Sequence, residues 1–494
     1  MDLIYGILNA LTPANLLYCF AGCVLGTLVG VLPGLGTAST LAILLPLTMH
    51  IDPTGSIIML AGLYYGAQYG GSTTSILVNI PGEVSSVPTC FDGFQMTRQG
   101  RAGEALWIAA IGSFIAGTLG ALGLSVIGPG LARFAFQFGP PEYFALILFS
   151  MTALISFSGS SLIKGVGAAL LGIILASIGV DPVTGTMRLS FGSTALTRGF
   201  DIVPVAVGLF GIGEILTSSG QGIGRIFEGK LGKMMPRGKE LRKGLWASLR
   251  GTAIGFPLGM LPGVTTPVAS FLAYDLEKRF SKHPEKFGTG VIEGVAAPEA
   301  ANNATAQAGF IPLMVFGIPT GPSPAIILAA LMLYGLQPGP LLFTANKDFA
   351  WTIIGSMYVG NVILLILNLP LVGLWARISQ IPYKYLAPII LGVCVIGAYS
   401  PRNTMFDVWV AFGFGLLAYA MRRNHWPLAP LILGFILGPM LELGLRQSLN
   451  MGPAMALISR PIVVALILAA IAVVVISLRY LRRLPEVVRT EEVE

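Results

Sequence analysis

The chain has 494 residues, of which 54% are hydrophobic and only 11% are charged, and its formal net charge is +7. Soluble domains carry about 25% charged residues, so this composition excludes an ordinary soluble domain and indicates an all-α polytopic membrane protein. Allowing about 20 apolar residues per span, we expect roughly ten to twelve spans, some of them broken or re-entrant. The positive charge does not indicate a nucleic-acid partner, because the basic residues gather in short loops between apolar stretches, as on the cytoplasmic side of membrane proteins.

The first half of the chain is expected to consist of apolar helices without a removable signal peptide, since the N-terminus lacks a basic region and a cleavage site. A helix over residues 14–48 is interrupted at residues 32–36, and a Gly/Ser/Thr-rich apolar segment over residues 55–80 ends at Ile80-Pro81-Gly82. A polar loop carrying Asp92, Arg98, Arg101 and Glu104 follows. Further apolar helices are expected over residues 105–132, 143–160, 163–180 and 200–216.

The second half repeats this order after a basic segment. A broken helix is expected over residues 246–276, and a polar small-residue stretch over residues 294–310 is closed by Ile318-Pro319-Thr320-Gly321. Apolar helices are expected over residues 325–343, 350–376, 385–399, 407–421, 427–445 and 460–480. We therefore predict a first transmembrane repeat (1–223), a basic cytoplasmic linker (224–243), a second repeat (244–484) and a disordered tail (485–494). Because the N-terminal arm is almost free of positive charge and can lie outside, the second repeat is expected to be inverted relative to the first.

A duplicated glycine pattern supports the two repeats. Gly22, Gly26, Gly30 and the pair Pro33-Gly34 recur as Gly251, Gly255, Gly259 and Pro262-Gly263, each displaced by 229 positions. Glycines at every fourth position allow two helix backbones to approach closely. In a membrane chain with internal duplication, Gly/Pro-broken helices at matching positions are the best sequence indication of a transporter's binding site.

The two breaks are suited to bind an anion. Each helix restarts after its break, at Thr37 and at Thr265, where free N–H groups and the positive end of the helix dipole favour a carboxylate. We predict that the following residues contact substrate or ion: Pro33, Gly34, Gly36, Thr37 and Ser39 in the first half, and Pro262, Gly263, Thr265 and Thr266 in the second. Unwound carbonyls and hydroxyls also suit a sodium ion, with Gly34, Thr37, Gly263 and Thr266 as its candidate ligands. The alternative is a pair of proline kinks that serve packing alone.

A second pair of segments is predicted to contribute to the same site. At a shift of 230, Tyr65–Ser75 aligns with Val295–Thr305, which places Ser72, Thr73 and Ser75 opposite Asn302, Asn303 and Thr305. Hydroxyls and amides inside an apolar span must find partners, either ligand and ion or other helices. Glu299 is predicted to be a proton carrier or cation ligand. Asn79, Pro319 and Thr320 lie at the breaks that end these segments and are included as candidates.

Other polar residues receive structural interpretations. Lys164 is expected to extend from a helix end toward the interface, and Glu214 and Arg446 are similar cases. His50, His283 and His425 are expected at the interface or in loops. Cys19, Cys23, Cys90 and Cys394 are interpreted as packing residues, because no set of metal ligands accompanies them.

Several motifs together resemble the large membrane subunit of the tripartite tricarboxylate transporters. They are Gly30-Val-Leu-Pro-Gly-Leu-Gly36, Tyr69-Gly-Gly-Ser-Thr-Thr-Ser75, Asn79-Ile-Pro-Gly82, Asp92-Gly93 and Ala297-Pro-Glu-Ala-Ala-Asn-Asn303. The resemblance implies a multi-pass bacterial inner-membrane importer of small di- and tricarboxylates, coupled to a sodium or proton gradient. It also implies a small four-helix membrane subunit and a periplasmic solute-binding protein as partners.

The remaining function classes are less consistent with the sequence. The chain has no GxxxxGK[ST] loop for ATP and no HExxH or GxSxG motif for an intramembrane enzyme, so we expect neither catalysis nor a cofactor other than a coupling ion. A passive anion channel is the alternative to a transporter, although broken helices favour an occluded site with alternating access.

Overall fold

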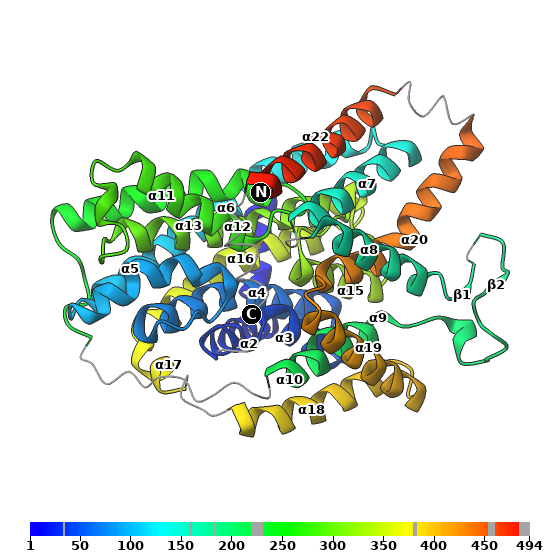
Figure 1. The fold of residues 1–494 in the computed structure, drawn as a ribbon, viewed down its shortest axis with the longest axis horizontal. Coiled ribbons are helices and arrows are strands. Elements are labelled where there is room, and N and C mark those ends of the chain that lie inside the picture. The colour runs from blue at the N-terminus through cyan, green and yellow to red at the C-terminus, as the bar shows by residue number, and fades with distance from the viewer. Residues whose placement is uncertain are drawn as a thin grey trace.

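The computed structural model describes residues 1–32, 35–157, 161–181, 183–218, 231–378, 383–452 and 460–483. Helices dominate these residues, and a short antiparallel hairpin projects from one side (Figure 1). The predicted all-α polytopic fold is confirmed. Seven helices in the described part are long and apolar enough to cross a membrane, and five further apolar helices are shorter.

The elements of the first half agree with most of the expected stretches. They are α1 (Asp2–Ala10), α2 (Pro13–Val31), α3 (Thr37–Thr48), α4 (Pro53–Val78), η1 (Val84–Ser86), α5 (Val87–Arg98), α6 (Ala102–Ala135), α7 (Pro140–Phe157), α8 (Leu162–Ala176), β1 (Gly179–Val180), β2 (Met187–Arg188), η2 (Leu196–Arg198), α9 (Ile202–Ala206), the π-helical turn η3 (Val207–Ile212) and α10 (Gly213–Ser218).

The elements of the second half follow the predicted order as well. They are α11 (Lys239–Gly259), α12 (Thr266–Phe280), η4 (Pro284–Lys286), α13 (Glu293–Ala308), α14 (Phe310–Phe316), α15 (Pro322–Leu333), η5 (Pro340–Phe343), α16 (Lys347–Asn368), α17 (Val372–Ile378), α18 (Tyr383–Tyr399), α19 (Met405–Arg423), α20 (Leu428–Met451) and α22 (Pro461–Arg483).

The expectation of a polar loop after residue 80 is wrong. Residues 87–98 form helix α5, which begins with Pro88 in its first turn and places Asp92 fully inside the protein. Asp92 accepts hydrogen bonds from the backbone N–H groups of Gly288, Gly290 and Val291 at 2.8–3.1 Å and from the Tyr274 hydroxyl at 2.9 Å. A single buried carboxylate thus attaches the connection between α12 and α13 to α5.

The duplicated glycines pack as the small-residue pattern predicts. In the first half α2 lies on α4, and a Cβ atom on Gly26 would lie 2.4 Å from the carbonyl oxygen of Leu63. In the second half α11 lies on α13, and a Cβ atom on Gly255 would lie 2.3 Å from the carbonyl oxygen of Ala301. Only glycine permits these two backbone contacts, so each repeat is held together by the same close helix pair.

The register of the second segment pair differs from the alignment at a shift of 230. Gly22, Gly26 and Gly30 contact Met59, Leu63 and Ala67, whereas Gly251, Gly255 and Gly259 contact Ala297, Ala301 and Thr305. The contact partners are therefore related by a shift of 238. The left-handed residues that end the segments, Asn79 and Gly317, obey the same shift. Ser72 thus corresponds to Phe310, because the connection before α13 is nine residues longer than its counterpart before α4.

Short helices of each half of the chain pack against elements of the other half. The short helix α3 of the first half packs against α15 of the second, and α12 of the second half packs against η1 and α5 of the first. The later helices repeat this exchange, since α8 packs on α20 and α19 packs on the π-helical turn η3. The short helices α3 and α12, which follow the two helix breaks, therefore each pack against elements of the opposite half of the chain.

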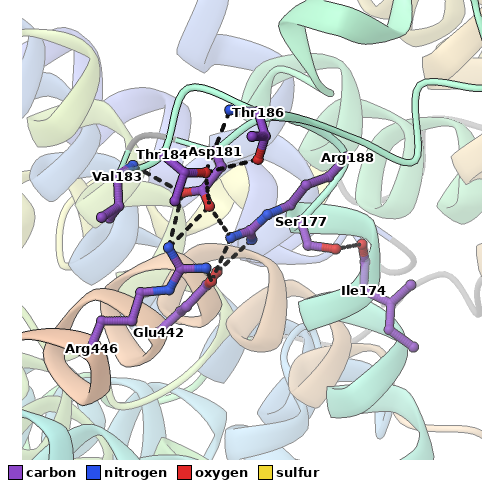
Figure 2. Close-up of polar contacts among 9 residues, drawn as sticks. All are labelled: Ile174, Ser177, Asp181, Val183, Thr184, Thr186, Arg188, Glu442 and Arg446. Carbon is purple, nitrogen blue, oxygen red and sulfur yellow. Dashed lines mark hydrogen bonds and ion pairs between the residues drawn. The ribbon is translucent and has the colours of Figure 1, made fainter. Parts of the chain in front are cut away.

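An ion-pair cluster holds the β1–β2 hairpin on α20 (Figure 2). Asp181 accepts hydrogen bonds from Arg188 at 2.5 Å and Arg446 at 3.0 Å, and both arginines also bind Glu442. The pKa of Asp181 lies well below its usual range, first because the Val183 N–H donates to the carboxylate and then because Thr184 and the two arginines also donate. This contribution to stability is complete above the ordinary aspartate pKa and is lost only as the pH falls through the lowered value. Arg446 is thus a structural residue.

Candidate functional site

A cavity of about 340 Å³ lies where the exchanged helices meet. The N-terminal turns of α3, α12 and α15 line it, together with η1, α4, the end of η3, α10 and α19. The lining includes backbone, hydroxyl, amide and charged groups from Gly36, Thr37, Ser39, Tyr64, Gln68, Glu83, Ser85, Glu214, Thr265, Thr266, Thr305, Thr320, Gly321, Ser323 and Arg422. Both halves contribute to this one cavity, as the duplicated breaks predicted.

The sequence explains why three helices begin at the cavity. The backbone is extended at the residue before each helix, which is Gly36, Thr265 or Gly321, so each helix starts anew at the next residue. Prolines occupy the first turns of α12 and α15. None of these three N-cap residues caps its own helix with a side chain. The N–H groups of Thr266 in α12 and Ser323 in α15 therefore remain available to another acceptor, while the prolines next to them have no N–H group. Three positive helix ends directed at one space are suited to bind a carboxylate.

One of these helix ends already binds a carboxylate of the chain itself. Glu83 Oε1 accepts a hydrogen bond from the Thr37 N–H at 2.8 Å and a second, very short one from the Thr37 hydroxyl. Glu83 also closes a capping box with Ser86 in η1. The positive end of α3 is thus neutralised by an acidic side chain that the sequence interpretation did not include.

A single arginine also lines the cavity. Arg422, in the last turn of α19, forms an ion pair with Glu214 of α10 at 2.6 Å, and both side chains are half-buried. Among the described residues that line the cavity, Arg422 is the only permanent cation. Guanidinium groups bind carboxylates with two parallel hydrogen bonds, so Arg422 can hold one carboxylate of a polyanion while a helix end holds another.

Next to the cavity lies a buried group made of one carboxylate, Glu299, and the hydroxyls of Ser72 and Thr89, called the acidic cluster below. Glu299 of α13 is completely inside the protein, and its two carboxylate oxygens accept hydrogen bonds from Ser72 and Thr89, both at 2.5 Å. Within the described part of the chain, neither oxygen of Glu299 pairs with a basic side chain. A carboxylate in such surroundings carries either a proton or a nearby cation, because an isolated buried charge is costly.

Asn302 is buried without hydrogen-bond partners. Its amide nitrogen and amide oxygen both lack a partner, although the residue is 0% exposed. Asn303, next to it, donates to Ser113 at 2.7 Å and to the Glu299 backbone carbonyl at 3.1 Å. Asn302 lies one helical turn from Glu299 on one side and from Thr305, which lines the cavity, on the other. Its unpaired amide is therefore available to a polar ligand or ion between the two.

A row of polar residues on α4 connects the cavity with Glu299. Tyr64 and Gln68 line the cavity, and Ser72, one turn further along the same helix face, donates to Glu299. The Gln68 amide oxygen accepts a hydrogen bond from Ser85 of η1 at 3.0 Å. The cavity and the acidic cluster are thus neighbouring parts of one polar region.

The structure divides the predicted site residues into groups. Those that line the cavity are Gly36, Thr37, Ser39, Thr265, Thr266, Thr305 and Thr320. Those in the acidic cluster or beside it are Ser72, Thr73, Ser75, Glu299, Asn302 and Asn303.

The remaining candidates lie elsewhere. Pro262, Gly263 and Pro319 are buried at the breaks outside the cavity lining, and Gly263 has a positive φ and contacts α7. Asn79 is exposed and ends α4 in the left-handed conformation. Pro33 and Gly34 lie outside the described residues. Of the candidate sodium ligands, the Thr37 hydroxyl is engaged by Glu83 and Thr266 faces the cavity.

The sequence interpretation missed several lining residues. Glu83 follows Ile80-Pro81-Gly82 directly, and its acidic character beside a break was a usable signal. Arg422 stands at the end of an apolar helix beside Arg423, where a pair of basic residues resembles an ordinary cytoplasmic boundary. Gln68, inside an apolar segment, and Ser323, between two prolines, carry weaker signals.

The residues given structural interpretations behave mostly as expected. Lys164 donates to the Asn424 backbone carbonyl at 2.8 Å, which places its ammonium group at the end of α19. His50, His283 and His425 are exposed near segment ends. The four cysteines are buried and free, and no group of three metal-ligating side chains occurs among the described residues.

Comparisons with known proteins identify the family. The model of the tripartite tricarboxylate transporter TctA family matches residues 16–433. An uncharacterized 52.8 kDa protein in the TAR-I ttuC' 3'region of Agrobacterium vitis is 46% identical over 490 residues, covering 97% of each chain. An uncharacterized protein in the TAR-II ttuC' 3'region of the same organism is 46% identical over 226 residues, which are 45% of this chain and 93% of the relative. No solved structure matches. The chain therefore belongs to the tripartite tricarboxylate transporter TctA family, as the large membrane subunit of a tripartite transporter.

Proposed function

We propose that the chain is the permease subunit of an ion-coupled importer of small di- and tricarboxylates. It lies in the bacterial inner membrane, receives its substrate from a periplasmic solute-binding protein and works with a small membrane subunit. The observation that supports this function best is the cavity at which the ends of α3, α12 and α15 meet Arg422. A polyanion placed there has one carboxylate at a helix end and another at the guanidinium group.

The acidic cluster is the proposed coupling site. A dianion that enters a cavity already containing Glu83 and Glu214 adds negative charge to an environment with one arginine. Coulomb repulsion between like charges is large at low dielectric, so a cation or proton must enter with the substrate. Glu299, which accepts a hydrogen bond from Ser72 of α4 and lies about two turns from Thr305 on α13, takes the proton or contributes to a sodium site, with the unpaired Asn302 amide as a further ligand.

Uptake in whole cells tests this proposal. Cells that express the chain with its small subunit and binding protein are supplied with radiolabelled citrate, malate or succinate. We expect accumulation above the external concentration, and its loss when a sodium ionophore or a protonophore collapses the driving gradient. Equilibration without accumulation for all three probes contradicts the proposal and favours a passive anion channel.

A further inference from the structure

The equivalent helix ends of the two repeats have different neighbours: a glutamate in the first repeat and a glycine in the second. Thr37, the first residue of α3, corresponds to Thr266, the first residue of α12, at the shift of 229. Glu83 corresponds to Gly321 at the shift of 238 that relates the two helix breaks. The first repeat therefore places a glutamate, and the second a glycine, at the position that faces the partner helix end.

The direction from Gly321 matches the direction that Glu83 takes. A Cβ atom on Gly321 would lie 3.3 Å from Thr265 Cγ2, the residue that precedes α12. Glu83 likewise extends to the start of α3, where its carboxylate binds the Thr37 N–H at 2.8 Å. Gly321 has φ near −176°, an extended backbone that any residue adopts, so its glycine is not required by the backbone conformation. Its lack of a side chain instead leaves the start of α12 accessible from the cavity.

We propose that a substrate carboxylate binds at the start of α12 as the Glu83 carboxylate binds at the start of α3. The Thr266 N–H and the hydroxyls of Thr265 and Thr266 donate to it, and Gly321 provides the space that a side chain would fill. The Glu83–Thr37 contact thus shows, within the chain itself, the way in which the substrate carboxylate binds to the second repeat. This inference rests on the proposed function and specifies where within the cavity the carboxylate lies.

A substitution that supplies an internal carboxylate tests this placement. Gly321→Glu introduces at α12 the arrangement found at α3, and Gly321→Gln has the same size without the charge. Purified wild type and both variants, with Gly321→Ala as a control for the added Cβ atom, are titrated with citrate, malate and succinate. We expect wild type and Gly321→Ala to bind at least one probe, and Gly321→Glu to bind it at least tenfold more weakly than Gly321→Gln. Equal affinities of the Glu and Gln variants overturn the inference.

Thermal unfolding without any probe gives an independent readout. If the new carboxylate caps α12, Gly321→Glu melts at a higher temperature than Gly321→Gln. The reason is that a charged carboxylate interacts more favourably than a neutral amide with the free N–H groups and the positive end of the helix dipole. An equal or lower melting temperature contradicts the proposed geometry. The failure of wild-type protein to bind or transport any carboxylate contradicts the proposed function instead, whatever the ranking of melting temperatures.

A substitution in the first repeat covers the case in which the Gly321 variants do not fold. Glu83→Ala removes the internal carboxylate from α3, and added acetate is expected to raise its melting temperature by more than that of wild type, in which only the start of α12 is open to a free carboxylate. No acetate-dependent stabilisation of Glu83→Ala means that a free carboxylate does not bind in the Glu83 manner, and the inference fails.

Discussion

At the scale of single residues, the cavity contains more acid than base. Glu83 and Glu214 occupy the end of α3 and the Arg422 guanidinium group, two of the positions best suited to hold an anion. The hydroxyl groups of Thr265, Thr266 and Ser323 remain beside the other two helix ends. A substrate carboxylate thus competes with Glu83 at α3 and with Glu214 at Arg422, whereas the other two helix ends are open to it. Substitutions that change charge therefore report on substrate binding more directly than substitutions that change shape.

Arg422 is predicted to bind one substrate carboxylate. Arg422→Gln removes the cavity's cation, and we expect carboxylate binding to weaken by about 1.5–3 kcal/mol, the range for a hydrogen bond to a charged group. Citrate titration of the purified protein measures the change. Arg423→Gln is the matched control, because Arg423 is adjacent but exposed. Equal losses in the two variants contradict a direct role of Arg422 in binding.

Glu299 is predicted to act in coupling and not in substrate binding. In Glu299→Gln the amide retains the size of the side chain, accepts a hydrogen bond from one of the two hydroxyls of Ser72 and Thr89 and donates to the other, but cannot take up a proton. We expect gradient-driven accumulation to fall at least tenfold while exchange of labelled for unlabelled substrate across proteoliposome membranes continues. Glu285→Gln, at an exposed loop position, is the control. Loss of exchange together with accumulation means that Glu299 is needed for binding or folding.

At the scale of elements, the broken helices were predictable and the register of their partners was not. Proline and glycine act locally, so Leu32–Gly36 and Met260–Thr265 could be recognised as breaks from the sequence. The residue-by-residue correspondence between α4 in the first half and α13–α14 in the second is offset by a connection that is nine residues longer in the second half. Matching small residues in the sequence could not detect this offset. Glu83 was missed for a similar reason, since its partner Thr37 lies 46 positions away.

The close helix pairs are predicted to require their glycines. In Gly255→Ala the new Cβ atom would lie 2.3 Å from the Ala301 carbonyl oxygen, a backbone atom that cannot move alone. We expect a loss of about 1–3 kcal/mol in stability, the usual cost of overpacking, seen as a lower melting temperature in detergent. The same substitution at Gly413, a helical glycine with nothing within 4 Å, is the control and is expected to be neutral or slightly stabilising. A melting temperature of Gly255→Ala equal to that of wild type contradicts the packing described.

At the scale of the whole molecule, the exchanged contacts provide a structural basis for alternating access. The cavity is formed by helix ends from both repeats, and α3 and α12 each also pack on elements of the other repeat. Helices α4 and α13 are buried along nearly their whole length and form the interior, each packed on its glycine-rich partner α2 or α11, while α18 and α22 expose large apolar side chains. We propose that a displacement of the interior helices against the outer helices moves the cavity and its helix ends together, which would expose the site to one side of the membrane at a time.

Accessibility of a cysteine in the cavity distinguishes such a transporter from a channel. The four native cysteines are buried and free, so they are expected to give little background labelling. Ser323→Cys places a thiol in the cavity lining, and Ser193→Cys, in the exposed loop after β2, is the control. We expect a membrane-impermeant thiol reagent to modify Cys at position 323 from one side under a given gradient and from the other when the gradient is reversed, with protection by citrate. A channel leaves the position accessible from both sides at once, because no step closes the cavity, and labelling that is independent of the gradient and of citrate therefore contradicts alternating access.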